Sequence, residues 1–186
     1  MTRSQFIKKY GGKTIKFKDM PFEHQFSLAW YMAVDGEVWE LPKEYKPSQK
    51  YINSNYFRYI KELSKEFKKA LPIIVEEHSE EKFGLLNVPM KDFIKILWGK
   101  HKKLRGKHKK LNCEDIPEIE EGQKDFKTYH KWYMTERKGE FINHTSNKFP
   151  SILDGTWTDE LIQDGWHRFH VYVEKGLKKM PLVYFL

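Results

Sequence analysis

The C-terminal segment constrains the fold more than any other part of this chain. Residues 163–186 read QDGWHRFHVYVEKGLKKMPLVYFL and follow the short segment ELIQ, which predicts a strand. Asp164-Gly165 predicts a turn, because aspartate bonds nearby backbone N–H groups and glycine tolerates a positive φ. WHRFHVYVEK predicts a helix that ends at a C-cap glycine, Gly176. MPLVYFL predicts a second strand, with its proline near the strand start, where it costs little.

This strand, glycine turn and helix start also have the geometry of a phosphate site. Free N–H groups at a helix N-terminus point outward, and the helix dipole favours an anion there. His167 and Arg168 lie in the first turn, and a guanidinium suits bidentate phosphate binding. A capped surface helix with a solvated Arg168 is the alternative. Local residues leave both open, because glycine turns before helices are common.

Hydrophobic periodicity predicts the remaining elements. The expected strands are KTIKFK (13–18), VWELP (38–42) and FPSIL (149–153). The expected helices are 22–36 with its stop at Asp35-Gly36, 50–70 with its stop before Pro72, 91–98, and 125–138. Together with the C-terminal unit they predict a small α/β (α+β) protein.

Bulk properties exclude several classes of protein. The chain has 186 residues, enough for one domain with a real core. No stretch of about 18 apolar residues exists, so we expect no membrane span. The start MTRSQFIKKYGGK lacks the apolar core of a signal peptide. The single cysteine, Cys113, excludes an internal disulfide and a multi-cysteine zinc site. We expect a cytoplasmic protein without a membrane partner.

The C-terminal segment resembles the nucleotide-binding core of the ParB/sulfiredoxin superfamily. The matching residues are Gly165, His167, Arg168, Gly176, Met180, Pro181 and Leu182. FPSIL is similar to a preceding family strand, and IKFKDMPFE (15–23) resembles the opening strand of the family. The resemblance implies one domain over 1–186 with a small mixed sheet, in which residues of about 40–145 form a helical, basic insertion.

The resemblance also implies a function. It places the phosphates of ATP or another nucleoside triphosphate, with Mg²⁺ assisting, on Gly165, Trp166, His167 and Arg168. The expected activity is phosphoryl transfer or hydrolysis of nucleotide or nucleic-acid phosphates, as in a kinase, ATPase or nuclease. The candidate catalytic residues are Arg168, His167, Asp164 and Glu23. Arg168 would neutralise transition-state charge. Asp19 or Glu23 would act as base if it faces Arg168, and Asp164 would position a metal or a hydroxyl.

Departures from the family narrow this expectation. Trp166 stands where sulfiredoxins carry their reactive cysteine, and Cys113 is far away in the sequence, so we expect no sulfinic acid reduction. The chain ends at Leu186, where partition proteins continue into a helix-turn-helix, so we expect no DNA clamp. The stand-alone members carried by phages or mobile elements remain. If the chain is of this type, the alternative function is a non-catalytic protein that binds nucleic acid or a host protein complex, as anti-restriction or anti-CRISPR-like proteins do. Its expected location is then the cytoplasm of the host cell.

The charge balance points to an anionic partner. The formal net charge is +8 and the pI is about 9.3. Seven Lys and Arg residues fall in GKHKKLRGKHKKL, residues 99–111. The candidate contacts to DNA or RNA phosphates are Lys102, Lys103, Arg105, Lys109 and Lys110. The alternative is a solvated helix face or loop, neutralised by the acidic run EDIPEIEE that follows.

Two other sequence patterns are candidate binding features. His101 and His108 would share a helix face, but no third metal ligand accompanies them, so we predict no metal site. Aromatic and basic residues alternate in YFRYIKELSKEFKK and FKTYHKWYMTERK, which favours either base stacking or packing in the core. No Ser-His-Asp order, HExxH or Walker motif is present.

Overall fold

The computed structural model describes residues 1–35, 38–40, 56–111, 125–136, 149–155, 157 and 161–186. The six α-helices of these residues are α1 (Arg3–Lys9), α2 (Phe22–Trp30), α4 (Tyr56–Glu77), α5 (Met90–Leu111), α6 (Phe126–Glu136) and α7 (Trp166–Glu174). A 3₁₀ helix, η1 (Phe17–Asp19), precedes α2, and a π-helical turn, η2 (Tyr31–Asp35), follows it. None of these described helices is both long enough and apolar enough to cross a lipid bilayer.

Five strands of the described residues form one open mixed sheet, which makes the fold mixed α/β. They are β1 (Lys13–Lys16), β2 (Lys82–Pro89), β3 (Ser151–Leu153), β4 (Ile162–Asp164) and β5 (Lys179–Phe185), in the spatial order β1-β2-β5-β3-β4. The neighbours β3 and β5 are parallel, and the other pairs are antiparallel.

Gly84 fixes the register of β2 against β5. It lies opposite Tyr184, and the Tyr184 ring covers it so closely that a Cβ at Gly84 would lie 1.8 Å from the ring Cζ. No larger residue fits there without displacing the tyrosine. This matters because a slip of one residue in the register would exchange the two faces of a strand.

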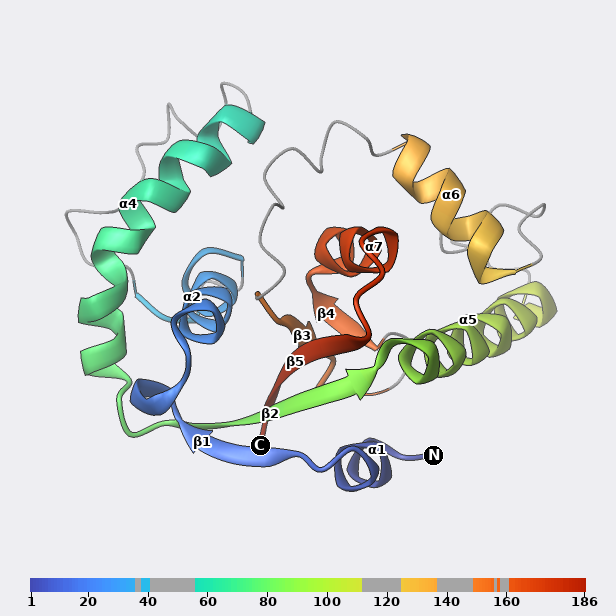
Figure 1. Ribbon diagram of the computed structural model, residues 1–186, viewed down its shortest axis with the longest axis horizontal. Helices are drawn as coiled ribbons and strands as arrows, with labels where there is room; N and C mark the ends of the chain where they lie inside the picture. Colours follow the sequence, from blue (N-terminus) through green and yellow to red (C-terminus); the bar gives the residue numbers. More distant parts are fainter. Residues whose placement is uncertain (36–37, 41–55, 112–124, 137–148, 156, 158–160) are drawn as a thin grey trace.

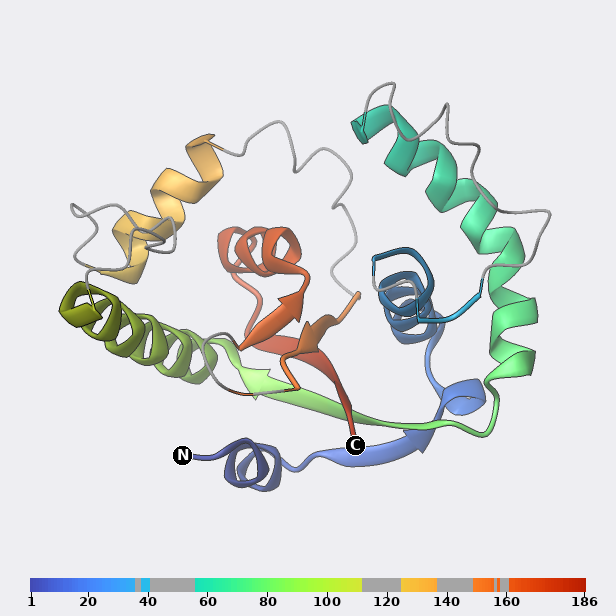
Figure 2. The same ribbon diagram turned by 180° about the vertical axis from the view of Figure 1, so that it is seen from behind.

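The two faces of the sheet carry separate layers of helices. Alternate strand residues point to opposite faces, so Leu182 joins one core and Val183 the other. The helices α2 and α4 cover the face of Val183. The helices α1, α5 and α7 cover the face of Leu182. Figure 1 shows α2 and α4 on one side and α5, α6 and α7 on the other, and the reverse view in Figure 2 agrees.

Most of the expected elements are confirmed. The structure has β1 within KTIKFK and β3 within FPSIL, while β4 begins inside ELIQ and ends one residue later at Asp164. The C-terminal unit is β4–turn–α7–β5. The strand expected at 38–42 is wrong for its described part, since 38–40 are irregular. The helix expected to stop before Pro72 is also wrong at that end, because α4 runs through Pro72 to Glu77. Burial of Leu71 and Ile74 beside it offsets the proline's missing backbone bond.

The region expected as a helical insertion also contributes to the sheet. Residues 82–89 form β2, which lies between β1 and β5. The helix expected at 91–98 is confirmed but longer, because α5 continues through the basic run to Leu111. The N-terminal helix α1 was not expected at all. Its Thr2 side chain accepts a bond from Gln5 N while the Gln5 side chain bonds Thr2 N, a complete capping box.

Candidate functional site

The DGWHR turn adopts the backbone that the sequence predicts. Strand β4 ends at Asp164, Gly165 has a φ of 96°, and α7 begins at Trp166. The carbonyl of Gly165 accepts bonds from Phe169 N at 2.9 Å and from Ser151 Oγ at 3.0 Å. Among the described residues, no side chain caps the helix start. The first N–H groups of α7 therefore keep the anion-binding character of an uncapped N-terminus.

Arg168 folds back over this turn and reaches α2. Its Nη2 donates to Asp164 Oδ2 at 2.5 Å, and its Nη1 donates to Ser27 Oγ at 3.0 Å. The Arg168 side chain is only 14% exposed. Its Nε is buried and has no hydrogen-bond acceptor among the described residues. The arginine is thus oriented by two partners and retains further donors, the buried Nε among them, that an anion or a water could use.

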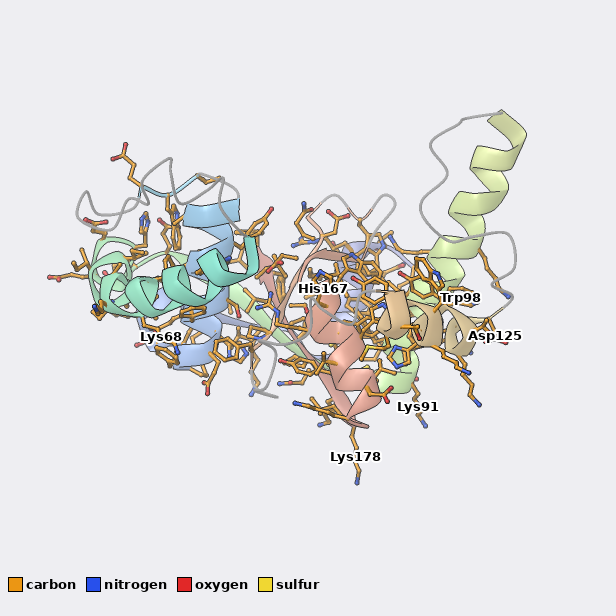
Figure 3. The ribbon with its side chains drawn as sticks, turned by 90° about the horizontal axis from the view of Figure 1, so that it is seen from above. Lys68, Lys91, Trp98, Asp125, His167 and Lys178 are labelled. Carbon is orange, nitrogen blue, oxygen red and sulfur yellow. The ribbon has the colours of Figure 1, made fainter. Side chains whose placement is uncertain are left out.

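His167 and Trp166 point away from Arg168, so the motif is divided between two sides of α7. Tyr133 Oη of α6 lies 3.1 Å from His167 Nδ1. Trp166 packs edge-on against Phe169 within the core. Figure 3 shows His167 at the start of α7, near the centre of the molecule. The structure therefore does not bring all four expected phosphate-binding side chains together. Only Gly165 and Arg168 converge with Asp164.

Glu23 lies on the part of α2 that approaches Arg168. It precedes Ser27 by four residues, and residues four apart are neighbours on a helix surface. Because Ser27 accepts a bond from Arg168, Glu23 stands one helical turn from that contact. Asp19 lies in η1, before α2 begins. Of the two expected bases, Glu23 has the better position.

Glu23 also lines a pocket of about 320 Å³. The other lining residues are Pro21, His24, Asn87, Leu177, Lys179 and Pro181. Burial lowers the pKa of His24 below its usual range, although the Glu23 carboxylate opposes that shift. The His24 Nδ1 is buried and has no hydrogen-bond partner among the described residues. An imidazole whose charged form is disfavoured by burial thus stands beside a carboxylate in a mixed polar and apolar recess at the start of α2.

The basic run lies on the second half of α5. The backbone of Lys103, Arg105, Lys109 and Lys110 is helical, while their side chains fall outside the described atoms; those of His101 and His108 do as well. Lys102 is exposed, and so are Lys91 and Lys95. In contrast, Lys100 Nζ donates to Trp157 O at 2.6 Å and lies 4.2 Å from that ring's centroid. In Figure 3 this half of α5 extends away from the rest of the molecule.

The described aromatic residues of α6 favour packing over base stacking. Tyr129 and Tyr133 are buried and form a cluster with Trp98 of α5. Phe126 packs against the main core. The side chains of 56–66, which carry part of the other aromatic stretch, lie outside the described residues.

Sequence reasoning missed two serines at this site: Ser27, which accepts a bond from Arg168, and Ser151, which donates to the Gly165 carbonyl. Both are buried, and both lie among apolar neighbours, Ser27 in FSLAW and Ser151 in PSIL. A buried serine needs a hydrogen-bond partner. A serine at an apolar position of a helix or strand is the signal that could have revealed them.

Comparisons of this chain with models of protein families, with curated proteins and with solved structures gave no match. Within the described residues, no group of three or more His, Cys, Asp and Glu side chains is arranged to hold a metal ion. An arginine fixed at an uncapped helix start, with a spare buried donor, can bind an anionic oxygen.

Proposed function

We propose that this protein binds a nucleotide through its phosphate groups at the start of α7. The observation that carries the proposal is the buried Arg168 Nε, which has no acceptor among the described residues and lies beside an uncapped helix N-terminus. A buried donor without an acceptor costs about 1–3 kcal/mol. A phosphate oxygen would supply that acceptor and would also interact favourably with the helix dipole.

The carboxylate of Asp164 competes for the same guanidinium. It holds Arg168 Nη2 at 2.5 Å, so a ligand must either share the arginine or displace the aspartate. A guanidinium has five N–H donors, and the contacts to Asp164 and Ser27 use two. Three donors therefore remain for a phosphate after both contacts are made. In this arrangement Asp164 and Ser27 hold the guanidinium in place before the ligand arrives.

The family resemblance supports the same proposal. The order β4, Gly165, α7, β5 is the order of the ParB/sulfiredoxin-like core, and we propose that the fold is of this type. We further propose that bound nucleotide undergoes phosphoryl transfer or hydrolysis, in which Arg168 neutralises developing negative charge. Glu23, one helical turn before Ser27 on α2, is the candidate base. The role of His167 is less direct, because its Nδ1 faces Tyr133.

Binding can be tested by thermal shift and calorimetry with ATP, GTP, CTP and UTP, each with and without Mg²⁺. A ligand at 100 times its Kd stabilises the folded state by about 2.7 kcal/mol. Arg168→Lys keeps the charge but loses the planar fork, and we expect it to weaken binding at least about tenfold. Arg3→Lys is the matched control, since Arg3 also has a buried Nε but lies on α1.

Three results would reject or limit the proposal. No stabilisation by any of the four nucleotides would reject the binding site. Equal affinity of wild type and Arg168→Lys would reject the role of Arg168. Binding without release of inorganic phosphate, and without transfer to an added acceptor, would reject the catalytic part alone.

A second function, nucleic-acid binding, is favoured by a row of lysines on α5. Lys91, Lys95 and Lys102 lie at spacings of four and seven residues, which place them on one helix face. All three are exposed, whereas Phe93 and Leu97 of the opposite face are buried. At 1.5 Å per residue the row is about 16 Å long. Such a length suits a linear polyanion better than a single phosphate.

This function predicts a steep dependence of binding on salt. Each phosphate contact contributes about 0.9 to the slope of log K against log salt on duplex DNA. Replacing Lys91, Lys95 and Lys102 together by Gln should lower the slope by about 2–3, as measured by fluorescence polarisation with a duplex. The matched control replaces three exposed lysines on other elements: Lys13, Lys68 and Lys82. Equal losses in both triple variants would show a net-charge effect and reject the α5 surface.

A further inference from the structure

A pair of histidines joins α6 to α7. His130 Nδ1 lies 2.8 Å from His170 Nδ1, and the two rings are parallel within 4°. His170 is completely buried. On the outer side, His130 Nε2 lies 3.1 Å from Glu174 Oε2. The three side chains form a chain of hydrogen bonds from the exposed carboxylate into the core.

The short distance limits how many protons this pair can hold. A separation of 2.8 Å between two nitrogens leaves room for one hydrogen between them. His130 Nε2 needs its hydrogen to donate to Glu174, so in the neutral pair His170 Nδ1 donates to His130 Nδ1. One added proton can occupy His170 Nε2 and still leaves a single hydrogen between the two facing nitrogens. A second added proton puts hydrogens on both facing nitrogens, and the contact cannot survive.

The surroundings of the pair also oppose a second positive charge. The Tyr133 ring stacks on His170 with a centroid distance of 3.9 Å. The Phe126 ring also stacks on both imidazoles, and the His130 side chain is 11% exposed. The titratable and charged groups that α6 contributes around the pair are Lys127, Tyr129, Lys131 and Tyr133. Those of α7 are His167 and Glu174. The helix α5 contributes the Trp98 ring, which packs against Tyr129. Glu174 is the anion among them, and its side chain is 64% exposed.

We propose that the docking of α6 on α7 is controlled by protons, through the His130–His170 pair. The docked state holds at most one added proton, whereas separated imidazoles take up two in the usual histidine range near pH 6.5. Docking is therefore stable above that range and weakens as the pH falls below it. Separation also breaks the contact between Tyr133 and His167, so it uncovers the first turn of α7. Acidification would therefore separate α6 from α7 and expose the side of α7 that α6 covers.

Hydrogen exchange of the α6 amides measures this directly. One extra proton in the undocked state raises the opening constant about tenfold for each pH unit below the titration range. The protection factors of α6, corrected for the intrinsic exchange rate, should fall by that factor between about pH 6 and pH 5. The amides of β5 should keep their protection, because the change is local. Constant protection of α6 over this range, or a parallel loss in β5, would overturn the proposal.

Two variants separate the histidine pair from other acid effects. His170→Phe keeps an aromatic ring in the buried position but cannot titrate, and His130→Gln removes the other member. In both, the pH dependence of α6 protection should disappear. His78→Gln is the control, because His78 stacks on Trp39 and contacts Glu81 in the other core. It should retain the full pH dependence.

Loss of protection at the β5 amides would show that a variant has not folded. The other variant then carries the test alone. A tenfold fall per pH unit that persists in a folded variant would overturn the proposal. Failure of both variants to fold would also overturn it, since the pair would then support the whole fold and not one helix.

Discussion

The Arg168 guanidinium of α7 donates a hydrogen bond to the Ser27 hydroxyl of α2 at 3.0 Å, across 141 residues of sequence. The two helices cover opposite faces of the sheet, so this bond joins the two layers directly. The same arginine is held by Asp164 at the end of β4. A candidate ligand-binding side chain is thereby also part of the tertiary structure.

This double role predicts an energetic coupling between Ser27 and Arg168. Ser27→Ala removes a bond to a charged group, and we expect it to lower the free energy of unfolding by about 2 kcal/mol. A double-mutant cycle with Arg168→Leu, measured by urea denaturation, should give a coupling of about 1 kcal/mol or more. Ser4→Ala on the exposed face of α1 should change stability by less than about 0.5 kcal/mol. Additive effects in the cycle would contradict the bond.

Gly165 should tolerate no side chain, for two separate reasons. Its φ of 96° disfavours L-residues, and a Cβ there would lie 2.4 Å from Ser151 Oγ and 2.8 Å from Arg168 Nη2. We expect Gly165→Ala to destabilise the fold by about 2–4 kcal/mol in chemical denaturation. Gly176→Ala is the control for backbone strain alone, because its φ is 67° with no atom within 4 Å of the added Cβ. Similar losses in both variants would show that the crowding at Gly165 is unimportant.

The C-terminal unit could be predicted from the sequence because its signals are local. Aspartate and glycine specify the turn, the apolar spacing specifies α7, and Gly176 ends the helix with a φ of 67°. The role of Ser27 could not be predicted in the same way. Its partner Arg168 is brought to it by the sheet and not by neighbouring residues.

Strand β2 shows a second limit of reasoning from local sequence. Its residues KFGLLNVP contain a glycine, an asparagine and a proline, which all weaken a strand pattern. Pairing with β1 and β5 on both sides overrides these preferences. Likewise, α4 passes through Pro72 because tertiary packing outweighs the local penalty. In both places contacts between distant segments decide the structure.

Glu80 should titrate far below an ordinary glutamate. Hydrogen bonds from Lys16 and Lys18, together with their charges, lower its pKa from 4.5 to about 2. Because the folded pKa is the lower one, the contribution of these contacts to stability is complete above about pH 4.5 and is lost as the pH falls toward 2. A carboxyl NMR titration should show the low midpoint. Replacing Lys16 and Lys18 together by Gln should raise it, and replacing Lys8 and Lys9 should not.

Tyr172 should make the fold sensitive to alkali. Its hydroxyl donates to Phe149 O at 2.6 Å, and burial raises its pKa to about 12. Because the folded pKa exceeds the unfolded value of about 10, this group's contribution is complete below pH 10 and is lost as the pH rises to about 12. The loss should reach about 2 kcal/mol, measured as the difference in unfolding free energy between wild type and Tyr172→Phe at successive pH values. Tyr10→Phe should leave this alkaline loss in place. A difference between wild type and Tyr172→Phe that stays constant from about pH 9 to 12 would contradict the burial of the phenol.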